Sequence, residues 1–206
     1  MLTLYLVRHG ETDWNTEQRM QGTVDTELNS TGVSQAERLA MRLGNKQISA
    51  VYSSALRRAI VTAEIIAGPH NLKVNHLAEF NEINYGAFEG LTRTEIRQRF
   101  AREWEERERD KANVPPPQGE SYLKLYGRVQ RGLDRVFSDH KKGSIVIVGH
   151  GGSLRMIIAN LMKTPVNSKL SSHKFKNGSL TVIEIDGTTA KQNIFNCDEH
   201  LREDEG

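Results

Sequence analysis

Two short apolar runs in this chain end in the same His-Gly pair. The run at 2–7 leads into Arg8-His9-Gly10, and the run at 145–148 leads into Gly149-His150-Gly151. Nearly continuous apolar runs of this length are typical of strands covered on both faces. Glycine after each histidine allows the backbone to turn. The pattern therefore predicts two buried strands, each with an imidazole at its carboxyl end.

The remaining apolar positions alternate between helical and strand spacing. Helical spacing covers 33–43, 56–67, 96–104, 123–136 and 153–162, and further strands are predicted at 48–52, 72–77, 180–185 and 191–195. Ser30 or Thr31 is expected to cap the first helix, and Ser53 and Ser54 the second. Strands that alternate with long helices predict an α/β fold, a three-layer α/β/α sandwich with a mostly parallel central sheet.

Residues 84–120 interrupt this alternation. A charged helix that begins at Thr92, with Ile96, Phe100 and Trp104 on its inner face, is followed by a proline-rich stretch that must break regular structure. We therefore expect one α/β domain over residues 1–206, with a cap insertion at about 84–120.

Composition narrows the class of protein. The 206 residues include 28 Lys and Arg against 26 Asp and Glu, and the signs alternate along 102–111, so the charge does not predict a nucleic-acid partner. No apolar run reaches the roughly twenty residues that cross a membrane. Cys197 has no second cysteine for a disulfide. A cytoplasmic enzyme is the expectation, with monomer and homodimer both open.

The candidate chemistry lies where the strands end. Ligands of such sheets bind at the carboxyl ends of the strands, and Arg58 follows the second strand much as Arg8 follows the first. Two arginines and two histidines brought together are costly to bury without an anion, and the guanidinium fork matches phosphate oxygens. Zinc is an alternative ligand of two histidines and a carboxylate, but the adjacent arginines would repel a cation. No metal and no cofactor is therefore expected.

The segment Arg8-His9-Gly10-Glu11-Thr12-Asp13-Trp14-Asn15 closely resembles the signature of the histidine phosphatase superfamily, in its cofactor-dependent phosphoglycerate mutase-like branch of small bacterial phosphatases. The resemblance continues through 53–63, 82–90 and His150-Gly151, in the same order and over nearly the whole chain. It implies metal-independent phosphoryl transfer through a phosphohistidine.

By this resemblance His9 is the nucleophile and Glu82 the proton donor. The groups that would bind phosphoryl oxygens or line the substrate side are Arg8, Asn15, Gln21, Gly22, Arg58, His150 and Gly151. By residue type alone, Glu82 has competitors in Glu11, Asp13, Glu79 and Glu89. The chemistry further requires His9 to be neutral at its attacking nitrogen, so its other nitrogen needs an acceptor such as a nearby carbonyl. Arg8, Arg58 and a protonated His150 can supply the positive charge without a metal.

One favoured function and three alternatives remain open on the sequence. A phosphatase for small phosphorylated metabolites is favoured over a phosphoglycerate mutase, because residues 104–119 are shorter than the mutase insertion and alternate in charge. Gly119-Glu120-Ser121-Tyr122 resembles the phosphatase branches, which include the fructose-2,6-bisphosphatase and α-ribazole phosphatase groups. An α-ribazole-5′-phosphate phosphatase is thus a second alternative, and an inert binding module a third.

Overall fold

The computed structural model describes residues 1–166 and 174–202. Its central sheet, within those ranges, has six strands in the order β3-β2-β4-β1-β5-β6. Their bounds are β1 Leu2–Arg8, β2 Ala50–Ser53, β3 Val74–His76, β4 Gly143–Gly149, β5 Leu180–Asp186 and β6 Thr189–Cys197. β3, β2, β4 and β1 are mutually parallel, β5 is antiparallel to β1, and β6 is antiparallel to β5. The predicted mostly parallel sheet is confirmed.

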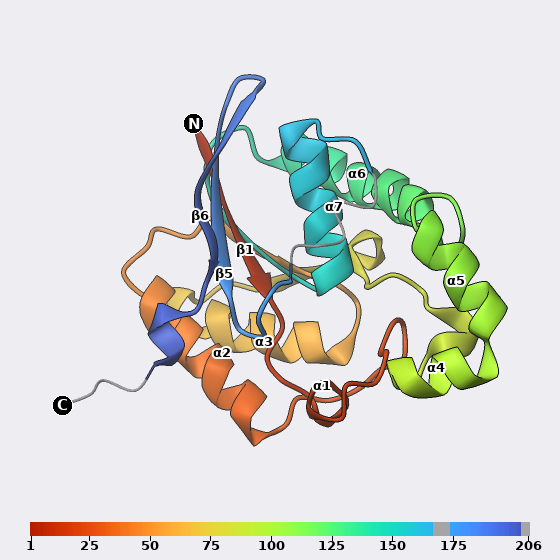
Figure 1. The fold of residues 1–206 in the computed structure, drawn as a ribbon. Coiled ribbons are helices and arrows are strands. Elements are labelled where there is room, and N and C mark those ends of the chain that lie inside the picture. Colours follow the sequence, from red (N-terminus) through yellow and green to blue (C-terminus); the bar gives the residue numbers. More distant parts are fainter. Residues whose placement is uncertain (167–173, 203–206) are drawn as a thin grey trace.

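Helices cover both faces of the sheet, which gives the three predicted layers (Figure 1). The α-helices are α1 Asp13–Thr16, α2 Ser30–Leu43, α3 Arg57–Ala67, α4 Arg93–Arg99, α5 Ala101–Arg109, α6 Tyr122–Asp139 and α7 Gly151–Met162. Short 3-10 helices are η1 Gly68–His70, η2 Ala78–Phe80, η3 Gly86–Phe88 and η5 Glu199–Leu201. No helix in the described ranges combines the length and apolarity needed to cross a membrane.

The core lies on both sides of β1. Leu4 and Leu6 pack toward α6 and α7, whereas Val7 packs toward α2 and α3. All three side chains are fully buried. Side chains that alternate between two apolar layers explain why the sequence shows a continuous apolar run here.

The two histidine-bearing strands are neighbours in this sheet. β1 and β4 pair in parallel with Arg8 opposite Gly149, so His9 and His150 follow at the same level. The backbone N–H of His9 also donates to the carbonyl of Gly149, at 3.0 Å. The sheet thus brings together two residues that are far apart in the sequence.

The predicted helix caps were wrong. Asn29, rather than Ser30 or Thr31, caps α2, because its side chain accepts a hydrogen bond from the Gly32 N–H. The serines at 53 and 54 precede α3, whose N-cap is Leu56 without a side-chain hydrogen bond. Instead, the Ser54 hydroxyl is hydrogen-bonded to His150, at 2.7 Å.

The helix predicted from Thr92 is two helices. Thr92 does cap α4, but Phe100 leaves the helical region with φ −136° and ψ 43° and separates α4 from α5. Ile96 and Trp104 remain buried, and they form a small separate core with Phe88. Leu123, predicted to face the core, is 45% exposed. The buried face of α6 consists of Tyr122, Leu125, Val129, Gly132, Leu133 and Val136.

Candidate active site

His9 and His150 face each other at the carboxyl ends of β1 and β4. Their ring centroids are 5.0 Å apart, and both side chains are buried. The Nδ1 of His9 lies 2.6 Å from the Gly10 carbonyl oxygen, which can only accept a hydrogen bond. The Nδ1–H must therefore donate, which leaves a lone pair on the Nε2 of neutral His9. This is the arrangement that the sequence argument required of a nucleophile.

Arg58 extends from α3 beneath the loop that follows α1. Its guanidinium is fully buried and donates to the carbonyls of Gly22 and Val24, each at 2.7 Å. Arg8, at the end of β1, donates through Nη1 to the Phe175 carbonyl. Each arginine is thus held by backbone carbonyls rather than by a carboxylate.

Three buried polar atoms of this cluster lack a partner. Among the described residues, the Nε of Arg8, the Nε of Arg58 and the Nδ1 of His150 make no hydrogen bond. A buried donor without an acceptor costs about 1 to 3 kcal/mol. An anion with several acceptor oxygens would satisfy all three atoms, so the cluster is suited to a phosphoryl group.

Burial and positive charge affect the pKa of each ionisable group in this cluster. Burial, followed by the positive charge of Arg58, holds the pKa of both imidazoles well below the ordinary 6.5. Burial also lowers the pKa of Arg8 and of Arg58 to about 10, and both remain charged at neutral pH. Burial and the neighbouring arginines thus oppose the protonated His150 of the sequence analysis, which would need the negative charge of a phosphoryl group beside it.

Glu82 places a carboxyl group beside the histidines. Its two oxygens accept from the backbone N–H groups of Ile83, at 2.9 Å, and Gly152, at 3.0 Å. Gly152 lies in the first turn of α7. Among the described residues that line the cavity, Glu82 is the one carboxylate. The competitors Glu11, Asp13, Glu79 and Glu89 lie outside that lining, and the choice between candidates therefore favours Glu82.

The other predicted site residues surround the same cavity of about 250 Å³, which is lined by Asn15, Gln21, Gly22 and Gly151. The Oδ1 of Asn15 accepts from the Thr12 N–H, at 3.1 Å. Gly22 has φ +54°, and a Cβ there would come within 2.0 Å of a Glu89 oxygen. Gly22 is therefore required both by the backbone conformation and by this contact.

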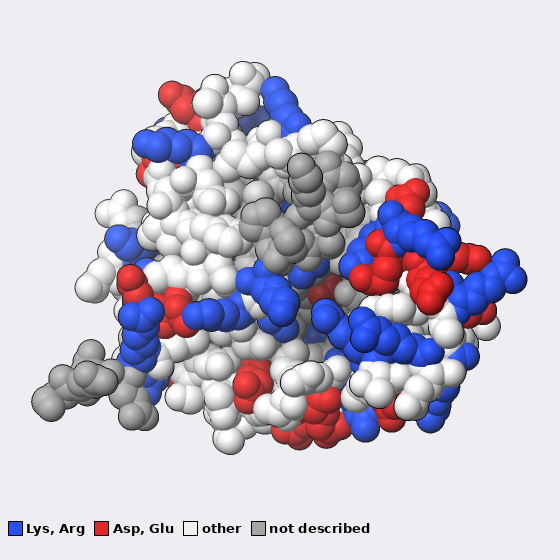
Figure 2. Space-filling view, viewed as in Figure 1, with Lys and Arg blue, Asp and Glu red and all other residues white. Residues whose placement is uncertain are grey.

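Sequence reasoning missed much of the cavity wall. Its further lining residues are Arg19, Met20, Tyr85, Arg93, Gly152, Arg155, Lys174 and Phe175. Several of these are cationic, and Lys and Arg gather around the hollow near the middle of the face in Figure 2. The cavity is thus more positive than the four predicted cationic and imidazole groups alone would make it.

Asn177 was also missed. Its amide Nδ2 donates to the carbonyls of His9 and Gly10, each at 3.2 Å, and to the Oδ1 of Asn15, at 3.0 Å. It precedes β5, which is antiparallel to β1, so it lies beside the end of β1. The pairing of these two strands was the signal that could have found it.

The structure contains no cluster suited to a metal ion in the part of the chain that it describes, by the criterion of three or more His, Cys, Asp or Glu side chains. The fixed charges of Arg8 and Arg58 beside the two imidazoles oppose cation binding. The site is therefore electrostatically suited to an anion.

Comparisons with known proteins agree with this geometry. A family model described as the histidine phosphatase superfamily (branch 1) matches residues 4–198. Phosphoglycerate mutase-like protein 4 of Arabidopsis thaliana is 37% identical over 204 residues, which cover 97% of this chain and 87% of that protein. Phosphoserine phosphatase 1 of Hydrogenobacter thermophilus is 32% identical over 186 residues, 90% of this chain and 88% of that one. The solved structure of Bacillus stearothermophilus YhfR has a TM-score of 0.90 at 33% identity and covers 98% of this chain and 100% of its own.

Proposed function

The chain belongs to the histidine phosphatase superfamily (branch 1) and is a phosphatase of that family, and we propose that it hydrolyses small phosphomonoesters through a phosphohistidine on His9. The observation that carries this proposal is the geometry around one imidazole. His9 lines the same cavity as Arg8 and Arg58, and its Nε2 keeps a lone pair. Among the described residues, the Nε of each arginine and the Nδ1 of His150, whose ring lies 5.0 Å from that of His9, have no hydrogen-bond partner.

In the first step the His9 Nε2 attacks phosphorus and the bond to the ester oxygen breaks. Arg8 and Arg58, together with the Nδ1–H of His150, would hold the equatorial oxygens as their charge changes. Asn15 would contribute from α1, the short helix that follows β1. Glu82 would give its proton to the leaving oxygen, so the alcohol leaves neutral.

In the second step Glu82, now a carboxylate, takes a proton from water while the water oxygen attacks phosphorus. The P–N bond breaks, the pair of electrons returns to the His9 Nε2, and inorganic phosphate leaves. Charge stabilisation comes from side chains of the protein throughout, so neither a metal ion nor a cofactor takes part.

The cavity favours substrates with an anionic group in addition to the phosphoryl group. Arg93, Arg155 and Lys174 also line it. A carboxylate or second phosphate on the substrate would lie in this positive field. Gln21, Gly22 and Gly151 would line the substrate side, and residues 84–120, which supply Tyr85 and Arg93, would act as a cap on a single domain. The proposed partners are thus small phosphorylated metabolites of the cytoplasm, not nucleic acids or membranes.

The main alternative is a mutase, because the Arabidopsis relative is called phosphoglycerate mutase-like. A mutase would return the phosphoryl group to its substrate instead of to water. An α-ribazole-5′-phosphate phosphatase is the other alternative and differs in the alcohol that leaves. Both alternatives use the same cluster, so only the products separate them.

The test is a screen of phosphoserine, phosphoglycerates, α-ribazole phosphate and sugar phosphates, with release of free phosphate as the readout. Rapid quenching with labelled substrate should leave acid-labile phosphate on the protein. His9→Ala should lose both signals, by about 10³-fold or more in rate. His70→Ala, which alters a histidine outside the cavity lining, is the matched control. A His9→Ala protein that turned over at the wild-type rate would contradict the proposal, and isomerisation without phosphate release would establish the mutase.

A further inference from the structure

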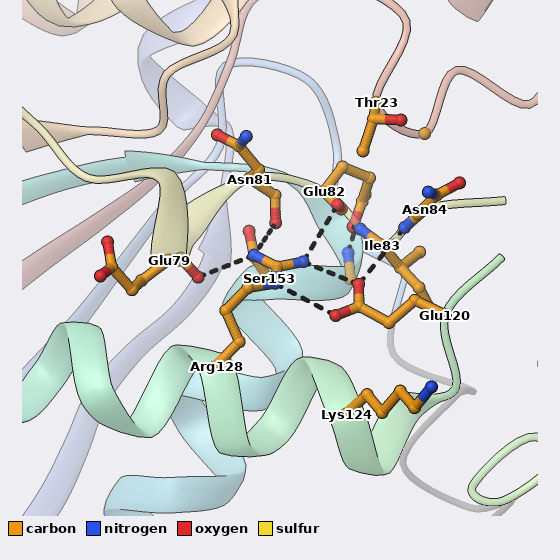
Figure 3. Close-up of polar contacts among 12 residues, drawn as sticks. Thr23, Glu79, Asn81, Glu82, Ile83, Asn84, Glu120, Lys124, Arg128 and Ser153 are labelled. Carbon is orange, nitrogen blue, oxygen red and sulfur yellow. Dashed lines mark hydrogen bonds and ion pairs between the residues drawn. The ribbon is translucent and has the colours of Figure 1, made fainter. Parts of the chain in front are cut away.

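Arg128 on α6 lies outside the lining of the cavity but contacts the segment that carries Glu82. Its guanidinium reaches that segment from below in Figure 3. Nη1 and Nη2 donate to four backbone carbonyls, those of Ala78 at 3.2 Å, Glu79 at 2.9 Å, Asn81 at 3.1 Å and Glu82 at 3.3 Å. A single side chain therefore binds nearly every carbonyl of this stretch.

Glu120 holds the same guanidinium from the other side. Its two oxygens accept from the Nε of Arg128, at 3.1 Å, and from Nη2, at 2.8 Å. Both side chains are largely buried, with 20% and 15% exposed. Such a bidentate pair fixes the plane of the guanidinium. The Glu120 backbone N–H also donates to the Asn84 carbonyl, at 2.8 Å, so Glu120 binds the far end of the segment directly.

The segment needs external support because residues 81–85 belong to neither a helix nor a strand. The Glu82 carboxyl group lies close against Gly152, in the first turn of α7. A Cβ at Gly152 would lie 2.2 Å from one Glu82 oxygen, and the Gly152 N–H donates to the other. A shift of the backbone at Glu82 would therefore move its carboxyl group away from the first turn of α7.

We propose that Arg128, oriented by Glu120, is a positioning residue that holds the Glu82 carboxyl group at the leaving oxygen. This inference rests on the proposed role of Glu82 as proton donor. Arg128 has no contact with the cavity and acts through the backbone of residues 78–84. It also assigns a role to Glu120, which lies in the Gly119-Glu120-Ser121-Tyr122 motif that the phosphate site itself does not use.

The experiment compares two classes of substrate. An alkyl phosphate leaves as a strongly basic alkoxide and needs the proton of Glu82, whereas p-nitrophenyl phosphate leaves as a stable anion and does not. Arg128→Met should lower kcat/KM for the alkyl phosphate by about 10- to 100-fold and for p-nitrophenyl phosphate by no more than about threefold, because a displacement near 1 Å is enough for such losses. Inhibition by inorganic phosphate should be unchanged, because the anion cluster is intact.

Two further variants keep the test decisive if Arg128→Met folds poorly. Arg128→Lys keeps the charge but not the planar guanidinium with its paired N–H donors. Glu120→Gln keeps the shape of the side chain but not its charge. Each should lower kcat/KM selectively for the alkyl phosphate, by a smaller factor than Arg128→Met does. Arg131→Met is the matched control, since Arg131 lies on the same helix and, within the described part of the chain, its side chain donates only to the Gly127 carbonyl. This control should leave kcat/KM unchanged for both substrates.

A Glu82→Gln variant distinguishes failure of this inference from failure of the proposed function. Glu82→Gln should give the same selectivity for the alkyl phosphate, at least as strongly. Suppose that Glu82→Gln lowers kcat/KM selectively for the alkyl phosphate, whereas the Arg128 and Glu120 variants lower kcat/KM equally for both substrates. Arg128 and Glu120 are then merely structural, and the inference is overturned. If Glu82→Gln is not selective, the proposed role of Glu82 fails first.

Discussion

The Nε2 of His150 is hydrogen-bonded to the Ser54 hydroxyl, at 2.7 Å, and this contact links the end of β4 to the turn before α3. The other ring nitrogen, Nδ1, is buried and has no hydrogen-bond partner among the described residues. The same turn leads to Arg58 in the first turn of α3. The hydroxyl that looked like a helix cap in the sequence thus orients a site residue.

The buried imidazoles should make stability depend on pH. Both have a pKa well below 6.5 in the folded protein, chiefly through burial and the charge of Arg58, whereas the unfolded chain protonates them near 6.5. Below that pH the unfolded state binds more protons. The free energy of unfolding should therefore fall with decreasing pH, by up to about 1.4 kcal/mol per unit for each histidine, until pH reaches the folded pKa.

Urea unfolding at pH 7.5 and 5.5 measures this dependence, in buffers without phosphate, because a bound anion would stabilise the folded state. His150→Asn is the comparison. Between pH 7.5 and 5.5, the free energy of unfolding of this variant should fall by about 1 kcal/mol less than that of the wild type. An equal loss in both proteins would show that His150 is not held neutral in the folded state.

Arg58 should be essential for turnover. Replacement by methionine removes a buried donor to the anion and frees the carbonyls of Gly22 and Val24. We expect kcat/KM to fall by about 10²- to 10³-fold, as when one oxyanion donor is removed, together with weaker inhibition by inorganic phosphate. Arg57→Met is the matched control, because Arg57 is exposed and pairs with Glu27 at the surface. Equal effects of the two variants would refute the assignment.

Gly152→Ala should displace the Glu82 carboxyl group without unfolding the protein. The added Cβ would lie 2.2 Å from a Glu82 oxygen, so the side chain must move. The rate with alkyl phosphates should fall by about 10²-fold. Gly127→Ala is the control on α6, where a Cβ meets nothing within 4 Å. That variant should be fully active and more stable by about 0.5 to 1 kcal/mol, as measured by thermal or urea unfolding.

Activity should survive a strong chelator. The positive charge that a phosphatase needs is supplied here by Arg8 and Arg58. Dialysis against EDTA, followed by assay in metal-free buffer, should leave kcat unchanged. Complete loss of activity that zinc or magnesium restores would replace this mechanism with a metal-dependent one.

Much of the site could be predicted because its key residues immediately follow strands. A buried strand is visible as an apolar run, and His9 and His150 are the first residues after two strands of this kind. Parallel pairing then places both at one edge of the sheet. Local sequence was sufficient here because each residue's position along its strand fixes its position in space.

The rest of the cavity wall could not be predicted, because it is built from contacts between distant segments that no local sequence pattern encodes. Asn177 lies at the site only because β5 runs antiparallel beside β1. Arg93 and Tyr85 come from a segment whose helix breaks at Phe100, which helical spacing alone did not indicate. Ser54 was misassigned for the same reason, since its partner lies 96 residues further along the chain. Such contacts follow from the tertiary arrangement and not from propensity.

The residue-for-residue match between β1 and β4 restricts how this protein can change in length. Arg8 lies opposite Gly149, and each strand continues for a single step to its histidine. One amino acid inserted within either strand would turn all later side chains to the opposite side of the sheet and separate the two rings. Both central strands must therefore keep a fixed number of residues up to their histidines.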